Sequence, residues 1–495
     1  MLATVRAFTL DGVSARPVQV EADVHRGLPA FSIVGLPDVA VREARERVRA
    51  ALQNCGFDFP QCRITVNLAP ASLRKAGPGL DLAIALSLLI ASGQVRSESF
   101  GRAAVTGELA LDGAVRSVPG ALAMAEEARR AGRAIVLPAV NGPEAALAGD
   151  VEVLPVESLA QLKGLADGGW RPSRPRPLRL VREAAEGPDL ADLRGQPRLR
   201  FALEVAAAGG HSLLIVGPPG AGKSLAARRL PSILPAPGLE EALELARIAS
   251  ACGLLDRTAG RRPFRAPHHT ISVAGLVGGG NPPRPGEVTL AHGGVLFLDE
   301  IAEFRRDALE ALRGPLEDRQ VTISRTGSGR CLPCDFMLVA AANPCPCGRG
   351  EADPGCRCTP LEVSRYARRL SGALADRMDI VVSVSQPAPG EIAGPPGEGS
   401  AAIRERVAPA RARQEARLGA GRRNAAMTPA QTRDAPLSGE ASEILAAAYR
   451  GERLSGRAHD RVIRVARTIA DLEATDEIGP EALARALELR RREET

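Results

Sequence analysis

Residues 217–224, GPPGAGKS, have the spacing of a phosphate-binding loop, G-x-x-x-x-G-K-[ST], and follow the apolar run LLIV, which predicts a strand. Glycines let successive backbone N–H groups point at phosphate oxygens. Lys223 would neutralise β- and γ-phosphate charge, and Ser224 would bind Mg²⁺. A chance glycine turn is the alternative interpretation. The expected contacts of ATP with this loop are Gly217, Pro218, Pro219, Gly220, Ala221, Gly222, Lys223, Ser224 and Leu225.

Two acids end a second apolar run, GGVLFLDE at 293–300. In open α/β sheets, ligands bind at the carboxyl ends of the strands. We therefore expect Asp299 to hold Mg²⁺, directly or through water, and Glu300 to polarise the attacking water as a general base. The alternative is that both acids only cap the start of a helix.

Two further polar residues follow in chain order. The run DFMLVAAANP (335–344) ends in Asn343, whose amide could orient the attacking water or contact the γ-phosphate. Arg377, in DRMD (376–379), precedes the apolar run IVVSV and could stabilise transition-state charge on a neighbouring subunit's nucleotide. Either residue in isolation would be interpreted as structural. Their order relative to the phosphate loop favours a catalytic role.

Six of the nine cysteines lie within 331–358, which indicates metal binding rather than disulfides. Four of them form the pattern C-x-C-x₈-C-x-C, which suits a closed, structural Zn²⁺ site; redox-active thiols are the alternative. We interpret the separate pair Cys331 and Cys334 as buried or incidental. The predicted zinc ligands are Cys345, Cys347, Cys356 and Cys358.

These residues need a scaffold of strands and helices. Apolar strand runs alternate with helices in the central part of the chain, which predicts a parallel sheet covered on both faces. The tail lacks strand patterning and predicts helices only. We expect an α/β unit at 1–165, a Pro-, Gly- and Arg-rich linker at 166–185, an α/β core at 186–390 and a helical unit at 391–495.

In the first unit we expect three helices, with Asp38 capping the first of them, and a hairpin that turns at Asp112-Gly113. The expected helices span 38–54, 81–91 and 121–131, and the expected strands span 17–24, 30–34, 63–70 and 134–137.

Composition adds little to these motifs. The chain has 495 residues, of which 64 are basic and 58 acidic, for a net charge of +6. This mild positive excess permits nucleic-acid binding but does not establish it. No apolar run is long enough to span a membrane, and the first residues lack the features of a signal peptide. We therefore expect a cytoplasmic protein with no membrane partner.

The order of these motifs resembles AAA+ ATPases, whose fold is a P-loop core followed by a helical lid. The segments RPFRAPHHTIS, GGGNPPRPGEVTLAHGGVLFLDE and AANPCPCG resemble the Mg-chelatase-like branch of that family. The resemblance assigns further roles: adenine-side contact to Gln196, Walker B to Asp299 and Glu300, sensor 1 to Asn343, arginine finger to Arg377, and sensor 2 to Arg457, with Arg461 as the rival.

What the family implies about function goes beyond the motifs. It implies a homohexameric ring that moves on DNA and helps branch migration of single strands, so single-stranded and branched DNA are the expected partners. It also implies that the stretch containing His268 and His269 is an insertion in the second helix of the core. We favour a structural or DNA-contact role for these histidines over a catalytic or metal-binding one.

The N-terminal unit resembles the Lon protease domain, a ribosomal S5-like α/β fold, over 74–86 and 106–138. Gly79 occupies the position of the Lon serine nucleophile, and Leu122 that of its general-base lysine. A Ser–Lys dyad therefore cannot operate. Ser72 and Lys75 are close in sequence but outside the matching positions. We expect no peptidase activity and an accessory role in binding DNA or a partner.

Other functions share the ATPase core. A magnesium chelatase motor subunit is the main alternative to a DNA motor. An ATP-dependent protease is disfavoured by Gly79 and Leu122. A scaffold that only binds is disfavoured because Lys223, Asp299 and Glu300 are all present.

Overall fold

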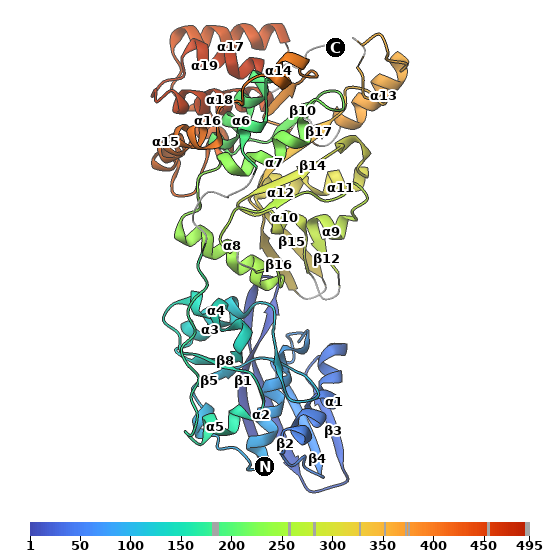
Figure 1. Cartoon of the computed structure of the whole chain (residues 1–495), viewed down its shortest axis with the longest axis vertical. Helices are drawn as coiled ribbons and strands as arrows, with labels where there is room; N and C mark the ends of the chain where they lie inside the picture. Colours follow the sequence, from blue (N-terminus) through green and yellow to red (C-terminus); the bar gives the residue numbers. More distant parts are fainter. Residues whose placement is uncertain are drawn as a thin grey trace.

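The computed structural model describes the chain except residues 181–187, 256–258, 281–283, 326–327, 351–352, 372–373, 375–376, 453–455 and 491–495. Parts of three segments lie outside the described residues: the linker predicted at 166–185, the Gly/Pro-rich stretch 277–286, and the stretch 455–472, which contains both candidates for sensor 2. Figure 1 shows the N-terminal unit at one end of an elongated molecule, the phosphate-loop core in the middle and the C-terminal helices at the other end.

The N-terminal unit is built on a seven-stranded sheet of order β3-β4-β2-β1-β5-β8-β9. β1 pairs antiparallel with β2, and β2 with β4, whereas the remaining neighbours are parallel. The strands are β1 (Leu2–Asp11), β2 (Ser14–His25), β3 (Ala30–Val34), β4 (Arg63–Ala69), β5 (Ala103–Val105), β8 (Ala134–Pro138) and β9 (Val153–Val156). β1 was not predicted from the sequence.

Helices cover both faces of this sheet. The long helices α1 (Val39–Asn54) and α2 (Asp81–Ala91) pack on one face, and α3 (Ala121–Arg130) packs on the other. Asp38 caps α1 as predicted, since its Oδ1 accepts the Val41 N–H at 2.8 Å. The predicted hairpin is present as β6 (Glu108–Leu109) and β7 (Val115–Arg116). Two shorter helices complete the unit, α4 (Gly142–Ala145) and α5 (Gln161–Ala166).

The described part of the predicted linker is not fully solvated. The Leu178 N–H donates to the Pro143 carbonyl at 2.9 Å, and the side chain of Leu180 packs against the core under α3. This stretch therefore lies along the N-terminal unit, where apolar residues bury surface that a free connector would leave in water.

The core carries a five-stranded parallel sheet of order β11-β14-β17-β10-β18, which confirms the predicted parallel sheet. Because all strands run the same way, their carboxyl ends lie at one edge. The strands are β10 (Leu213–Val216), β11 (Phe264–Arg265), β14 (Val295–Leu298), β17 (Met337–Ala342) and β18 (Ile380–Ser383).

Alternate residues of these strands enter two separate cores. Leu213 and Ile215 face the helices α6 (Pro197–Gly209) and α7 (Lys223–Ile233), whereas Leu214 faces the opposite side. Burial on both faces explains the uninterrupted apolar runs in the sequence. Helices of the opposite layer include α11 (Arg306–Ala311) and α12 (Arg313–Asp318), and α13 (Pro360–Ser371) contacts the short turn after β14.

Between the first core strand and β14 the chain forms α8 (Leu239–Ala251) and then a short two-stranded ribbon. The ribbon, β12 (Gly278–Gly279) with β13 (Arg284–Pro285), separates α9 (Val273–Val277) from α10 (Glu287–Leu290). A longer hairpin, β15 (Gln320–Arg325) with β16 (Ser328–Pro333), precedes β17.

The C-terminal part is helical, as predicted, and it packs on the core. α15 and α18 contact α6 within one continuous apolar core. The helices are α14 (Pro389–Ala393), α15 (Ser400–Leu418), α16 (Pro429–Arg433), α17 (Gly439–Glu452), α18 (Gly456–Leu472) and α19 (Pro480–Glu488). Among the described residues, no helix has the length and apolar character needed to cross a membrane.

The N-terminal unit contacts the core through α8. The Gly120 N–H at the start of α3 donates to the Ser250 carbonyl at 2.8 Å, and Arg247 pairs with Glu126 at 3.5 Å. At the turn between β1 and β2, Val13 joins a small apolar cluster with Ile248 and Leu332. The first strands of the chain are therefore anchored on the unit that carries the five-stranded sheet.

Candidate active site

The predicted phosphate loop joins β10 to α7 at the carboxyl edge of the core sheet. Gly220 (φ 82°) and Gly222 (φ 87°) adopt left-handed backbone conformations, which side chains with a Cβ rarely tolerate. This turn brings the loop to the start of α7, where unpaired N–H groups and the helix dipole favour an anion. The glycine spacing is thus required by the backbone path.

Lys223 is held close to the loop. Its Nζ donates to the carbonyls of Gly217 at 2.5 Å and Pro218 at 2.9 Å, and to Asn343 Oδ1 at 3.1 Å. Burial lowers the pKa of Lys223, while the charges of Asp299 and Glu300 act in the opposite direction. A nucleotide phosphate would offer this buried ammonium a stronger, charged acceptor than a carbonyl.

Ser224 and Asp299 meet across the sheet edge. Ser224 Oγ donates to Asp299 Oδ2 at 2.7 Å. Both are hard oxygen donors, and neighbouring ligands of an octahedral Mg²⁺ with bonds of about 2.1 Å lie roughly 3 Å apart. These two residues therefore fit a magnesium ion with little movement.

Glu300 follows directly and is exposed. Its backbone is left-handed (φ 50°), which costs a non-glycine residue roughly 1–2 kcal/mol. Its N–H donates to Asp299 Oδ1 at 3.0 Å, so the backbone of Glu300 orients the preceding carboxylate. The alternative in which both acids only cap a helix does not account for the contact between Ser224 and Asp299.

The predicted adenine-side residue lies next to the loop. Gln196 caps the start of α6, and its Nε2 donates to the Ser385 carbonyl at 2.5 Å. Leu193 is close enough that a Cβ on Gly222 would lie 3.4 Å from Leu193 Cδ1. The segment before α6 therefore borders the phosphate loop.

Arg377 lies at the opposite edge of the sheet. β10 and β18 are parallel neighbours, in which Leu213 pairs with Ile380 and Val216 with Ser383. Arg377 comes before β18, whereas the phosphate loop comes after β10. Four strand residues separate the two edges by about 13 Å. Arg377 pairs there with Glu317 on α12 at 2.5 Å. Arg377 is therefore not placed to contact a nucleotide bound at the phosphate loop of its own chain.

The two candidates for sensor 2 differ in their surroundings. Arg461 pairs with Asp379 at 3.6 Å, and Asp379 also accepts the Ser212 N–H at 3.1 Å and lies 3.4 Å from His211. This cluster is at the amino edge, away from the phosphate loop. Arg457 is exposed at the start of α18 and makes no hydrogen bond or ion pair within the described chain.

The four predicted zinc ligands come together. Their sulfur atoms all lie within 4.8 Å of one another, and Cys345 is 3.3 Å from Cys347 and 3.8 Å from Cys356. Sulfurs bound to a tetrahedral Zn²⁺ at about 2.3 Å lie roughly 3.8 Å apart, so the set fits this ion. The Gly350 N–H donates to Cys345 Sγ at 3.2 Å. Hydrogen bonds, first that from Arg349, lower the pKa of Cys347 to about 6.

The other cysteine pair is separate from this cluster. Cys334 is buried, and desolvation raises the pKa of its thiol to about 12. Cys331 is exposed and donates to Gln320 Oε1 at 2.9 Å. Neither belongs to the single group with metal-binding geometry found in the described chain.

His268 and His269 follow β11, the neighbour of β14, and also lie outside that group. Their rings are 4.1 Å apart, His268 Nδ1 lies 2.9 Å from Thr270 Oγ1, and His269 lies edge-on to Phe304.

The protease-like positions carry no nucleophile or base. The Gly79 carbonyl accepts the Thr106 hydroxyl at 3.0 Å, and Leu122 is fully buried. Lys75 is buried and donates its ammonium to the Pro70 carbonyl, and desolvation lowers its pKa. Ser72 is exposed.

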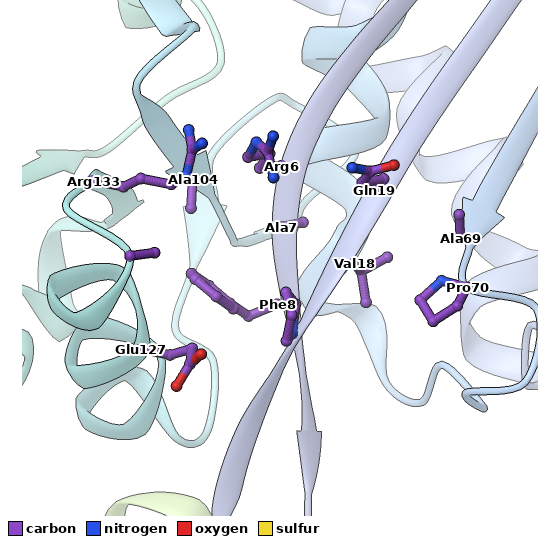
Figure 2. A pocket seen from close by; sticks show the side chains of 12 residues that line it. Arg6, Ala7, Phe8, Val18, Gln19, Ala69, Pro70, Ala104, Glu127 and Arg133 are labelled. Carbon is purple, nitrogen blue, oxygen red and sulfur yellow. The ribbon is translucent and has the colours of Figure 1, made fainter.

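A cavity of about 410 Å³ opens beside α3 in this unit and is lined by residues of β1, β2 and β5. Figure 2 shows Arg6 and Arg133 on the same side of it. Its lining contains no serine, cysteine or lysine, so it offers no nucleophile for peptide cleavage.

Two sets of residues were not anticipated from the sequence. Glu317, the partner of Arg377, lies 60 residues away in the chain. The His211–Asp379 cluster, in which Thr468 Oγ1 also lies 2.7 Å from His211 Nε2, ties the lid to the core sheet. Asp379 belongs to the DRMD segment, but nothing in that pattern names its partners.

The strand order, the phosphate loop and the acids at one sheet edge define a P-loop ATPase core of the AAA+ type. Three family profiles match the chain: magnesium chelatase, subunit ChlI, at 189–392; subunit ChlI of Mg-chelatase at 20–141; and magnesium chelatase, subunit ChlI C-terminal, at 397–490.

Comparison with individual proteins indicates the same family. The chain is 42% identical to YifB of Escherichia coli K12, over 99% of this chain and 97% of that protein. It is 40% identical to competence protein ComM of Haemophilus influenzae, over 98% of this chain and 97% of ComM. It is also 31% identical over 196 residues to Lon protease 2 of Bacillus subtilis. The chain belongs to the Mg-chelatase-like ComM/YifB family, which confirms the family resemblance.

Proposed function

We propose that this protein is a ring-forming ATPase motor that moves on DNA and drives branch migration during transformation or recombination. The observation that carries the proposal is the position of Arg377, at the sheet edge opposite the phosphate loop of the same chain. A site whose arginine comes from a neighbour is complete only in an assembly. The similarity of this chain to the competence protein ComM, over almost the whole length of both, supports DNA as the molecule on which the motor moves.

The proposed reaction is in-line attack of water on the γ-phosphate of ATP. Lys223 neutralises phosphate charge, Glu300 accepts the proton of the attacking water, and Asn343 positions that water. Mg²⁺, held by Ser224 and Asp299, would add further charge neutralisation. The Arg377 guanidinium acts across the protomer boundary on transition-state charge. Arg457, exposed at the start of α18, is the proposed sensor 2.

We propose a homohexamer working in the cytoplasm, on single-stranded and branched DNA. Basic side chains around a central channel would bind phosphates regardless of base sequence, so affinity should fall steeply with salt. Zn²⁺ on the four cysteines would be structural, because four thiolates leave no open coordination position.

A magnesium chelatase-type motor subunit is the second candidate. All three matching profiles carry chelatase descriptions, including the one at 20–141. The N-terminal unit therefore does not separate the two functions by itself.

A branch-migration assay on a three-stranded DNA substrate, with ATP and at graded salt, tests the proposal. We expect strand displacement by the wild type that needs ATP, and none by the Lys223→Ala variant. ATP hydrolysis that DNA does not stimulate, without any strand displacement, would favour the chelatase-type alternative.

A further inference from the structure

We propose that the four-cysteine knuckle, made of residues 345–350 and 353–358, braces the phosphate loop through Gly348, so that metal bound by the knuckle sets nucleotide affinity. The inference rests on the proposed ATPase function and assigns the knuckle a part in it. Gly348 is the positioning residue.

The knuckle touches the phosphate loop directly. Gly348 is buried and left-handed (φ 85°). A Cβ at this position would lie 2.9 Å from Pro219 Cδ and 3.0 Å from its Cγ. Pro219 is the third residue of the phosphate loop, and its ring has little freedom to give way. The knuckle backbone at Gly348 therefore packs directly against the Pro219 ring of the phosphate loop.

Pro219 has a second contact, which comes from the segment after β18. Gln386 Nε2, after β18, donates to the Pro219 carbonyl at 3.1 Å. Pro219 thus has one contact from the segment after β18 and another from the knuckle. Losing either contact would free the loop from its phosphate-binding path.

The knuckle also lies close to Asn343, the residue proposed as sensor 1. Asn343, which accepts a hydrogen bond from Lys223, stands two residues before Cys345. The same Cβ at Gly348 would lie 3.9 Å from Asn343 Cγ. Movement of the knuckle would therefore disturb two residues of the candidate site, Pro219 and Asn343.

The sequence of the knuckle offers few side chains from which an apolar core could be built. Its sequence, CPCGRGEADPGCRC, contains no large aliphatic or aromatic side chain. Thiol hydrogen bonds are weak, so contacts among the four sulfurs would not fix the segment. Segments this small need a metal or a disulfide to hold one conformation. A bound Zn²⁺ would supply that constraint.

The test combines metal analysis with binding of a fluorescent ATP analogue to the full-length chain. Gly348→Ala should keep its zinc and weaken analogue binding by about tenfold or more, because a small misplacement of binding groups is costly. Gly93→Ala is the matched control, because Gly93 has a similar φ of 77° with nothing within 4 Å of an added Cβ. It should bind as the wild type does.

A second pair of variants tests the metal. Cys356→Ser with Cys358→Ser should lose zinc and weaken binding to a similar degree, and adding Gly348→Ala should cost little more because both changes act through one contact. Cys331→Ser should keep both zinc and affinity. For the wild type, a chelator should lower affinity and added Zn²⁺ should restore it, which avoids dependence on variants that fail to fold.

Normal affinity in Gly348→Ala, or in zinc-free wild type, would overturn the inference. A failure of the proposed DNA motor is distinguishable, because it would abolish strand displacement while leaving the zinc-dependent change in analogue binding.

Discussion

Lys223 and Asn343 are joined by a hydrogen bond of 3.1 Å between the ammonium and the amide oxygen. The lysine follows β10 and the asparagine follows β17, and these two strands are neighbours in the sheet. The pair thus fixes the phosphate-binding cation relative to the residue proposed to position water.

Removing the Asn343 amide should separate binding from chemistry. In Asn343→Ala, we expect ATP affinity within a few-fold of wild type, since Lys223 keeps two carbonyl acceptors. The turnover number should fall by about tenfold or more, because the water loses its orienting group. Steady-state hydrolysis and analogue binding measure the two effects. An equal loss of both would indicate that Asn343 only shapes the loop.

Glu300→Gln should bind ATP and hydrolyse it poorly. A general base typically contributes about 10²–10⁴-fold to rate, and the amide keeps the size of the side chain. Single-turnover hydrolysis measures the loss, and Glu303→Gln, three residues further along, is the control. Near-normal hydrolysis by Glu300→Gln would remove this residue from the mechanism.

Arg377→Ala and Lys223→Ala should complement each other. Each variant alone should be nearly inactive, since an arginine finger is worth about 10³-fold or more. In mixed assemblies, some sites combine the intact phosphate loop of an Arg377→Ala protomer with the intact arginine of a neighbouring Lys223→Ala protomer. These sites should be active. Hydrolysis measured across mixing ratios should pass through a maximum. Strictly additive activities would contradict action between protomers.

The stability of the N-terminal unit should depend on pH through the protonation of Asp81. Burial raises its pKa from 3.8 to about 6, despite paired hydrogen bonds from Arg47 at 2.7 and 3.0 Å. Between about pH 4 and 6 the folded chain therefore holds a proton that the unfolded chain has lost, so this group's contribution to stability falls as pH rises. Melting temperatures across this range should show that slope in wild type and lose it in Asp81→Asn.

The N-terminal unit should not cleave peptides. With Gly79 and Leu122 at the protease positions, we expect no casein turnover with or without ATP. Turnover that disappears in Ser72→Ala would show that a serine outside the matching positions had become the nucleophile.

Local signals predicted the elements that carry the site. The apolar run of α2 and the strand β3 match their predicted ranges to the residue, and the motif spacings indicated which strands end beside the phosphates. The first strand was missed although LATVRAFTLD alternates buried and exposed residues, because no turn residues precede it at the chain start. The hairpin β15–β16 was also missed, despite the alternation in QVTISR.

Pairings between distant residues could not be predicted. Glu317 opposite Arg377, and Asp379 between His211 and Arg461, depend on how helices pack at the amino edge of the sheet. The contact of Gly348 with Pro219 is equally invisible in sequence, since a glycine in a cysteine-rich loop has many explanations. Single-chain patterns specify periodicity and turns, but not which surfaces meet.

The contact between the first hairpin and α8 has a consequence for truncation. Val13, Ile248 and Leu332 bury one another where the two units meet, and Glu144 accepts the Ser250 hydroxyl beneath α3. Deleting the first 165 residues would expose the side chains of Ile248 and Leu332 to water. It would also leave the Ser250 hydroxyl without its acceptor. We therefore expect the shortened chain to aggregate when it is expressed alone, so that the N-terminal unit would act as a structural support for the ATPase core.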